Sequence, residues 1–414
     1  MKTEKRSMLF FMAILGWVML ALVAVGNAAS EPQTAASAPS DKLGFHTTEA
    51  EGVRKCLVVL VNFSDVSRRF PERWIGERIT RFLGPYLQEA SYGKLTLTFQ
   101  VTKPYVLPKP VSYYKISPRN QEVDRSKIVA LVSDAVNAAD NDVNFNDFAY
   151  VILALGATHR EYGMVGLCPI PGMLGFQTLS VSAKSGETVT KVAIFCENAH
   201  LGTYAHDTLH MLGGLIGKQR VTPCLYDHDL QARYPHMPEF AKAMINMGFW
   251  DPLSSHAPYR YELPKPTGLS SWTKMRLNWI PESKIALVQP GRTATVKLDP
   301  LTDGNGATLV IKIPLTPTTF YLVENRQQVG QDANCPSSGV LVMYADDSVA
   351  ECHKGKAPVK IMDANPDVPY LNDAAFDIGK KDRFIDPKNN IAVILQEKEG
   401  LSYRIQITTA EGAH

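Results

Sequence analysis

Two kinds of hydrophobic pattern follow one another along the chain. In the earlier part, apolar runs at 55–63 and 148–155 are typical of buried strands, and residues 95–101 alternate as a half-buried strand does. Residues 75–87 and 126–139 carry apolar side chains three and four positions apart, which predicts amphipathic helices. The order strand, helix, strand, helix, strand predicts an α/β layer.

The later part of the chain consists of short alternating runs separated by Gly, Pro, Asn and Asp. These runs lie at 294–298, 308–313, 320–324, 339–344, 391–396 and 403–408. No long helical pattern intervenes, so they predict a separate antiparallel β-sandwich. The pattern changes between Pro281 and Pro290, so we expect a first domain over 53–285 and a β-sandwich domain over 286–414.

The first 28 residues have the pattern of an export signal. A basic start is followed by an uncharged apolar run from Met8 to Val25 and then by small residues, which predicts cleavage after Ala28. An uncleaved anchor is the alternative, because the apolar run reaches the lower length limit for spanning a bilayer. The small polar residues of 29–52 predict a flexible leader. We therefore expect a mature protein outside the cytoplasm, secreted or periplasmic, without stable membrane insertion.

Charge and composition narrow the classes of partner. The chain has 43 basic and 41 acidic residues, and 45% of its residues are hydrophobic, as in a globular protein. Most of the excess positive charge lies in the predicted signal, so the mature chain is close to neutral. Because it has no basic block, we expect no nucleic-acid partner.

The six cysteines become informative once export is expected. Disulfides persist in oxidising compartments, and proximity in the sequence favours the pairs Cys335–Cys352 and Cys168–Cys196. Cys56 lies inside an apolar run, where a buried free thiol is expected. No CxxC motif is present, so the sequence supports neither a zinc ribbon nor a thioredoxin-type redox site.

One segment carries the pattern of a metal-binding helix. His206 and His210 are four residues apart, so both rings project from the same helix face and can reach one metal ion. Asp207 stands where HExxH metalloproteases place their glutamate base. Gly213 follows the second histidine by three residues and allows the chain to leave the helix sharply, as in HExxHxxG proteases. Paired histidines on a helix also occur as structural residues, so the motif is weak when taken alone.

The chain as a whole resembles the immune inhibitor A-like family of secreted zinc metallopeptidases over residues 53 to about 408. The matching segments are 57–65 (LVVLVNFSD), 89–95 (EASYGKL), 206–213 (HDTLHMLG), 247–254 (MGFWDPLS), 268–280 (GLSSWTKMRLNWI) and 320–326 (FYLVENR). The resemblance implies a zincin-like α+β catalytic domain followed by a β-domain. It also implies that His206 and His210 bind zinc and that Asp207 is the general base.

This chain departs from the family pattern in three places. Asp207 is one methylene shorter than the family's glutamate, and Leu253 stands where many relatives have the methionine of a Met-turn. The family's short Gly-x-Pro-Asp-Leu-Tyr-Asp passage is stretched here, with Cys224 in the place of its first aspartate.

The third metal ligand is therefore open at the level of sequence. Asp227 is the first choice, because the Leu-Tyr-Asp match is intact and a carboxylate completes a His₂-carboxylate zinc site. Cys224, His228 and Asp229 are alternatives, and Asp227 could instead order the loop as an Asx residue.

These observations predict a secreted zinc-dependent endopeptidase that hydrolyses protein or peptide substrates, with Asp207 as general base. The alternative is a catalytically weak or inactive zinc-binding homologue that acts as a surface or binding protein. His256 follows the 247–254 motif and could line the cleft. The sequence specifies neither the cleavage preference nor the oligomeric state.

Overall fold

The computed structural model of the chain describes residues 42–413, apart from 72, 174–179 and 237–238. The expected export signal and most of the expected leader lie outside these residues. Within the described part, none of the helices has both the length and the apolar character needed to cross a membrane.

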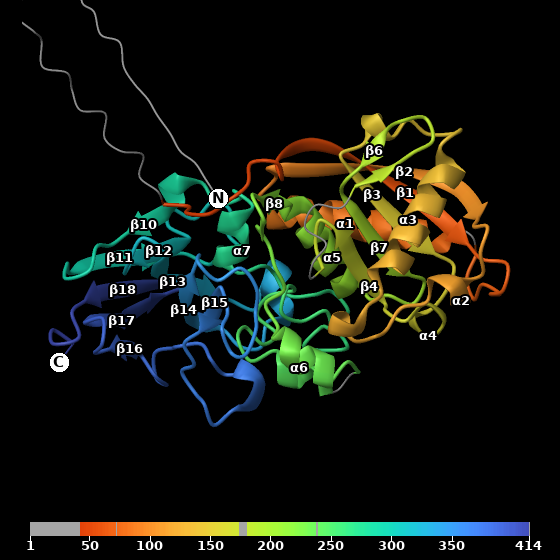
Figure 1. The fold of residues 1–414 in the computed structure, drawn as a ribbon. Helices are drawn as coiled ribbons and strands as arrows, with labels where there is room; N and C mark the ends of the chain where they lie inside the picture. The colour runs from red at the N-terminus through yellow and green to blue at the C-terminus, as the bar shows by residue number, and fades with distance from the viewer. Residues whose placement is uncertain (1–41, 72, 174–179, 237–238, 414) are drawn as a thin grey trace, which may run out of the picture. The chain divides into compact units, whose positions relative to one another are not determined.

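A five-stranded sheet with the order β2-β1-β3-β7-β4 forms the scaffold of the earlier part of the chain (Figure 1). Its strands are β1 (Gly52–Asn62), β2 (Leu95–Val106), β3 (Tyr150–Leu155), β7 (Val192–Cys196) and β4 (Gly166–Ile170). The pairs β1–β2, β1–β3 and β3–β7 are parallel, whereas β4 pairs antiparallel with β7 and forms one edge. The strands expected from the apolar patterns at 55–63, 95–101 and 148–155 are confirmed.

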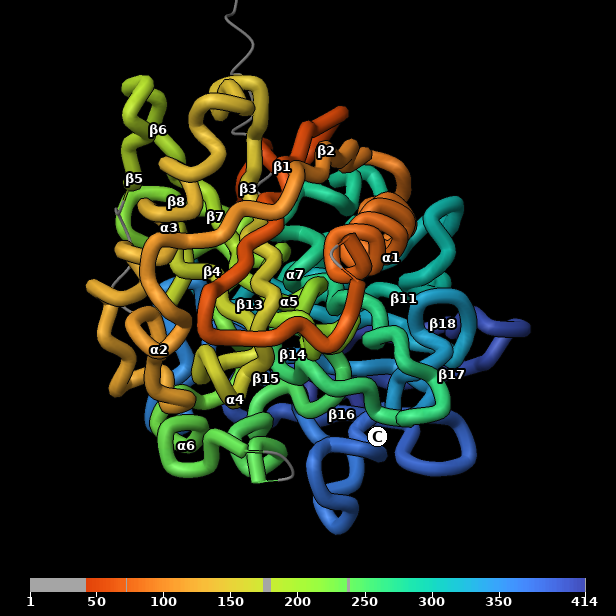
Figure 2. The backbone as a smooth tube through the Cα atoms, turned by 90° about the vertical axis from the view of Figure 1, so that its right-hand side faces the viewer, coloured from red at the N-terminus to blue at the C-terminus, as the bar shows by residue number. Residues whose placement is uncertain are grey.

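Three long helices cover the two faces of this sheet. They are α1 (Trp74–Ala90), α3 (Arg125–Ala139) and α5 (Leu201–Gly213). In β1, Val58 and Leu60 share a core cluster with side chains of α1 and α5, whereas Val59 and Val61 share another cluster with α3. The expected helices at 75–87 and 126–139 are thus confirmed. Figure 2 shows α1 and α3 on opposite sides of the sheet. Burial on both faces explains why β1 reads as a continuous apolar run.

Short elements connect and extend this layer. They are α2 (Val111–Tyr114), η1 (Asn120–Glu122), η2 (Phe145–Asp147), α4 (His159–Tyr162), β5 (Val181–Ser182), β6 (Thr188–Val189), β8 (Leu215–Ile216), β9 (Gln219–Arg220), α6 (His228–Arg233), η3 (Glu239–Ala243), α7 (Ser271–Arg276) and η4 (Glu282–Lys284). The hairpin of β8 and β9 and helix α6 lie in the passage that follows α5, where the chain departs from the resembling family.

Two further sheets form the later part of the chain. One has the order β10-β12-β13-β14-β15 and the other the order β11-β18-β17-β16. Their elements are β10 (Ile285–Leu287), β11 (Ala294–Leu298), β12 (Val310–Pro314), β13 (Thr319–Arg326), η5 (Gly330–Asn334), β14 (Gly339–Asp346), β15 (Val359–Ile361), η6 (Pro369–Leu371), β16 (Arg383–Asp386), β17 (Ile391–Glu399) and β18 (Ser402–Thr408). Neighbouring strands are antiparallel except β10 and β12, which are parallel.

The two later sheets share a hydrophobic core. Ile311 and Val323 of one sheet belong to the same cluster as Val393 and Ile405 of the other, as in face-to-face sheet packing. A second cluster draws members from both sides of residue 285, including Trp279 and Leu322. The fold is therefore a mixed α+β arrangement in which sheet regions pack through buried apolar side chains.

All six cysteines lie in the described residues, are buried and are free thiols. The expected pair Cys168–Cys196 is therefore wrong for this structure. The two residues lie on the neighbouring strands β4 and β7, but their side chains belong to clusters on opposite faces of the sheet. Each thiol instead donates to a backbone carbonyl, that of Pro171 for Cys168 and that of Met164 for Cys196.

The expected pair Cys335–Cys352 is also wrong for this structure. The Cys335 thiol donates to the carbonyl of Ser337 at 3.2 Å and packs in the large apolar cluster. Cys352 lies beside the start of α6, where its carbonyl accepts from the N–H of His228 at 3.0 Å. Nearness in sequence did not bring these two side chains together, because the intervening strand β14 carries them apart.

Candidate metal centre

Helix α5 is enclosed almost completely, so its side chains face protein or a cavity rather than solvent. Twelve of its thirteen residues are buried. It ends at a glycine pair: Gly214 has φ +63°, and a Cβ on Gly213 would lie 2.0 Å from Oγ1 of Thr222. The sharp exit expected from the sequence therefore requires glycine at the helix end. After this exit the chain turns back towards α5, where the Thr222 hydroxyl donates to the carbonyl of Leu209 at 2.8 Å.

The two histidines of α5 face each other through their Nε2 atoms, which lie 2.9 Å apart. Nδ1 of His206 lies 2.8 Å from the carbonyl oxygen of Pro252, and Nδ1 of His210 bonds the carbonyl of Thr222. A carbonyl oxygen only accepts, so both Nδ1 atoms carry the ring proton. This arrangement is the usual one for metal-ligating histidines, because it leaves Nε2 with a free lone pair.

Neither ring carries a proton on Nε2 that could form a hydrogen bond between the two rings. Burial holds the pKa of both His206 and His210 well below the ordinary value, and nearby positive charge acts in the same direction. Both rings are therefore neutral near pH 7. Two lone pairs at this separation repel each other unless a cation lies between them. A cation between the two atoms, or the Cys224 S–H donating to one of them, relieves this repulsion, so the pair could hold a metal ion.

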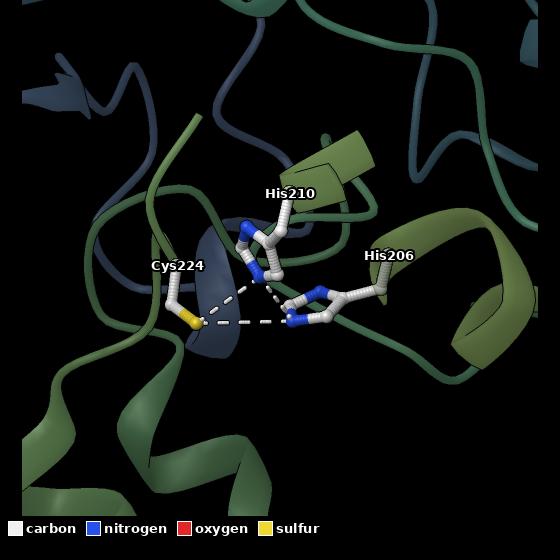
Figure 3. Close-up of side chains that lie close together, drawn as sticks. All are labelled: His206, His210 and Cys224. Carbon is white, nitrogen blue, oxygen red and sulfur yellow. Dashed lines mark hydrogen bonds between the residues drawn. The ribbon is translucent and has the colours of Figure 1, made fainter. Parts of the chain in front are cut away.

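Cys224 completes a group of three donors (Figure 3). Its Sγ lies 3.8 Å from Nε2 of His206 and 3.4 Å from Nε2 of His210. A tetrahedral zinc ion at ordinary bond lengths separates two nitrogen ligands by about 3.3 Å and a nitrogen from a sulfur by about 3.6 Å. The three donors fit such an ion with shifts of a few tenths of an ångström. Within the described part of the chain, this is the only such group of His, Cys, Asp or Glu side chains.

The surroundings of Cys224 determine whether its thiol is protonated. Burial raises the pKa of the thiol to about 11, against the opposing positive charge of Arg220. The hydroxyl of Tyr226 bonds the sulfur and also favours its charged form. Without a metal the thiol is protonated, and a metal that binds it must displace that proton.

Asp207 lies in the wall beside this group. Its side chain is enclosed, and its carboxylate accepts a hydrogen bond from the backbone N–H of Cys168 on β4. Burial raises the pKa of the carboxyl group well above its ordinary value, with the charge of Arg220 opposing the shift. Its Oδ2 has no partner among the described residues, and a Cβ on Gly166 would come within 2.9 Å of it. Glycine at 166 therefore makes room for the carboxylate.

Asp227, the first choice for third ligand, lies outside the group of three. Its Oδ1 accepts from the N–H groups of Asp229 and Leu230, so it caps α6, and its Oδ2 accepts from Gly355 N–H at 2.8 Å. His228 bonds Asn120 and Glu351, and Asp229 bonds Gln121 and the backbone of Lys354. The structure thus brings His206 and His210 together with Cys224, and not with Asp227, His228 or Asp229.

A cavity of about 430 Å³ opens beside the three donors. It is lined by His206, His210, Cys224, Asp207, Arg220, Tyr226, His228, Gln231, Phe240 and His256, and by Gly166, Leu167 and Cys168 of β4, among others. His256 lines it as the sequence suggested. The centre of its ring lies 3.9 Å from that of His206, and its Nε2 has no partner among the described residues.

Arg220 and Glu351 are site residues that sequence reasoning missed. Arg220 is 3% exposed and makes a two-pronged ion pair with Glu351, at 2.8 Å through Nε and 2.6 Å through Nη2. The partners are 131 residues apart in the chain. No spacing rule links residues so distant, so only the folded chain reveals the pair.

Comparison with known proteins adds little to this geometry. Neither a protein-family model nor a curated protein matches the chain. Nine chains of solved structures match, among them wild-type OgpA from Akkermansia muciniphila. That match has 10% sequence identity over 90% of this chain and 98% of the other, with a TM-score of 0.32. A TM-score of this size is too low to transfer fold or function. The site is therefore a group of two histidines and one cysteine that could hold a metal ion.

Proposed function

We propose that this protein is a zinc-dependent endopeptidase whose ion is held by His206, His210 and Cys224. The observation that carries the proposal is the pair of unprotonated Nε2 atoms 2.9 Å apart, beside a thiol, in the wall of a cavity of about 430 Å³. When bound there, zinc supplies a Lewis acid that polarises a scissile carbonyl and lowers the pKa of water towards ~7.

Asp207 is the proposed general base. It follows the first histidine on α5, lines the cavity and is oriented by the N–H of Cys168. Burial raises the pKa of its carboxyl group, which brings its basicity closer to what proton transfer near neutral pH requires. In the proposed reaction the carboxylate takes a proton from the attacking water and passes it to the leaving amine.

Strand β4 supports binding of an extended peptide. It is an edge strand, and its residues Gly166, Leu167 and Cys168 line the cavity. In the described residues no other strand pairs with its outer edge, although the N–H and the carbonyl of Cys168 are taken by Asp207 and by the N–H of Met173. A peptide laid along such an edge gains main-chain hydrogen bonds and presents its carbonyls to the wall opposite. The proposed substrates are therefore proteins or peptides in extended conformation.

A second candidate is a zinc-binding homologue with little or no turnover. It is favoured by Asp207, whose short side chain is drawn into the wall by Cys168 N–H and whose Oδ2 is enclosed. A thiolate ligand also reduces the Lewis acidity of the ion. Both candidates bind zinc, so only turnover separates them.

Zinc stoichiometry measured together with casein hydrolysis tests the proposal. We expect one zinc per chain, loss of hydrolysis on chelation and its return with zinc. Replacing both His206 and His210 with Ala should abolish stoichiometric zinc, whereas the matched change of His353, outside the group of three, should not. Full zinc retention by the double variant would end the metalloprotein proposal.

We further propose that the protein acts outside the cytoplasm after cleavage of residues 1–28. The support is the basic, apolar and small-residue order at the N-terminus. Identifying the first residue of the protein recovered from the medium or periplasm tests this proposal. Recovery of the uncleaved chain from the cytoplasm contradicts it.

A further inference from the structure

The cavity beside the proposed metal centre contains one permanently positive side chain. Among its described lining residues, only Arg220 and Asp207 carry groups that are ordinarily charged, and the remaining ionisable groups are histidine, cysteine and tyrosine. Arg220 ends strand β9, and its side chain is 2% exposed. A cation enclosed to this degree needs a fixed anionic partner.

Glu351 is that partner, and it comes from the loop between β14 and β15. Its two oxygens accept from Nε and Nη2 of Arg220 at 2.8 and 2.6 Å. Nε2 of His228 lies 3.2 Å from the same carboxylate, and Nδ1 of that ring lies 2.7 Å from the side-chain nitrogen of Asn120. These contacts hold the guanidinium plane in one orientation, so its free edge is preorganised.

Nε and Nη2 of Arg220 donate to Glu351, and Nη1 has no hydrogen-bond partner among the described residues. A carboxylate is the group that best matches this remaining edge, because it accepts in the plane of the guanidinium. The other carboxyl group of the lining, that of Asp207, already accepts from Cys168 N–H. It makes no hydrogen bond with Arg220, whose hydrogen-bond partner is Glu351.

We infer that Arg220 binds a carboxylate of the substrate, either on an acidic side chain or at the C-terminus of the peptide. The inference rests on the proposed peptidase function, because it assigns the substrate class of the same cavity. The substrates are then acidic peptides in the first case and peptides with a free C-terminus in the second. Glu351, from the later part of the chain, positions the arginine that selects them. A main-chain carbonyl bound at the same edge is the competing result.

Matched peptides test the inference directly. The first pair is acetyl-Ala-Glu-Ala-amide and acetyl-Ala-Gln-Ala-amide, which differ in charge and little in shape. The second pair is acetyl-Ala-Gln-Ala with a free or an amidated C-terminus. Affinity is measured by calorimetry on zinc-loaded protein carrying Asp207→Asn, and kcat/KM on the wild type. We expect one pair to differ by at least about tenfold in favour of the acid, as a charge-assisted hydrogen bond provides. The pair that differs identifies the source of the carboxylate.

Variants of Arg220 then show whether this residue causes the preference for the acid over the amide. Arg220→Met should bring the acid-to-amide ratio close to one, and Arg220→Lys should retain part of it, because charge remains but the fork is lost. Since Arg220→Met leaves Glu351 unpaired, the double variant with Glu351→Gln keeps the test valid if the single variant unfolds. The matched control is Arg160→Met, which removes an exposed arginine next to a lining residue.

Every outcome of these measurements either supports or overturns the inference about Arg220. Equal values for acid and amide in both wild-type pairs overturn the inference, and so does an unchanged ratio in the Arg220 variants. A uniform loss for all three peptides assigns Arg220 to a main-chain carbonyl and also overturns it. Failure of the proposed function shows differently, as absent hydrolysis of every peptide, while calorimetry still reports whether Arg220 selects the acid.

Discussion

Two enclosed groups of charged side chains differ in how completely they are paired. Arg326, at the end of β13, is 0% exposed. It donates from all three guanidinium nitrogens, to Asp332, Glu324, Thr267 and the carbonyls of Trp250 and Gly268. At the candidate metal centre, by contrast, Oδ2 of Asp207, Nε2 of His256 and Nη1 of Arg220 have no hydrogen-bond partner among the described residues, and the two histidine Nε2 atoms have only each other and the Cys224 thiol.

This difference distinguishes a structural cluster from the candidate site. Buried polar groups in folded proteins are paired almost without exception, because an unpaired group loses its hydration and gains nothing in return. The Arg326 cluster obeys this rule and joins the earlier and later parts of the chain. The metal centre violates it at several neighbouring atoms, which is expected where a ligand supplies the missing partners.

The paired cluster should cost the most stability when broken. Arg326→Met leaves Glu324 and Asp332 enclosed without their cation, so we expect the free energy of unfolding to fall by about 3–5 kcal/mol. Urea denaturation measures the change. The matched control is Arg404→Met. The Arg404 side chain is 49% exposed and pairs with Glu399 at the surface, so its loss should change stability far less. Equal effects of the two variants contradict the comparison.

Asp207 should show the opposite behaviour, with a large effect on turnover and a small one on stability. Asp207→Asn keeps the shape but removes the proposed base, so kcat should fall about 10³-fold while zinc stays bound. Asp207→Glu should not raise kcat, because the longer side chain no longer fits between Gly166 and the N–H of Cys168. Rates on casein with zinc analysis measure both. Unchanged turnover in Asp207→Asn removes this residue from the mechanism.

Cys224 provides the test of the ligand set. Cys224→Ser should weaken zinc binding by at least about 100-fold, because the thiolate is the strongest of the three donors. Cys352→Ser is the matched control, since this buried thiol lies outside the donor group. Competition with a chromophoric chelator measures both affinities. If the two variants lose zinc equally, or neither does, Cys224 is not a ligand.

Much of the scaffold could be predicted from the sequence because its patterns are local. The apolar run of β1 and the spacing of α1 and α3 report burial that neighbouring residues share. The same holds for His206 and His210, which a single helix turn brings together. The sharp exit at Gly213 is local as well, since it lies within one turn of His210. Asp207 follows His206 and lines the same cavity, and its role as base stays a prediction.

The rest of the site depends on the path of the chain after α5. The hairpin of β8 and β9 returns the chain to the helix, so Cys224 reaches the histidines whereas Asp227, three residues later, faces α6 and Gly355. A match to Leu-Tyr-Asp cannot report that path. The two expected disulfides fail for a similar reason, since closeness in sequence says nothing about which face of a sheet each thiol occupies.

Asp227 supplies the last test, with the smallest expected effect. Its carboxylate has hydrogen-bond partners within the protein, although it lies in the loop beside the candidate metal centre. Asp227→Ala removes the cap of α6 and the contact with Gly355 N–H, so the free energy of unfolding should fall by about 1 kcal/mol. Zinc affinity should not change. Asp124→Ala is the matched control, since Asp124 caps α3 by accepting from Ser126 N–H and is not among the residues that line the cavity. The two aspartates should then behave alike in urea denaturation and in zinc titration. A selective loss of zinc in Asp227→Ala would instead show that Asp227 is a zinc ligand and does more than cap α6.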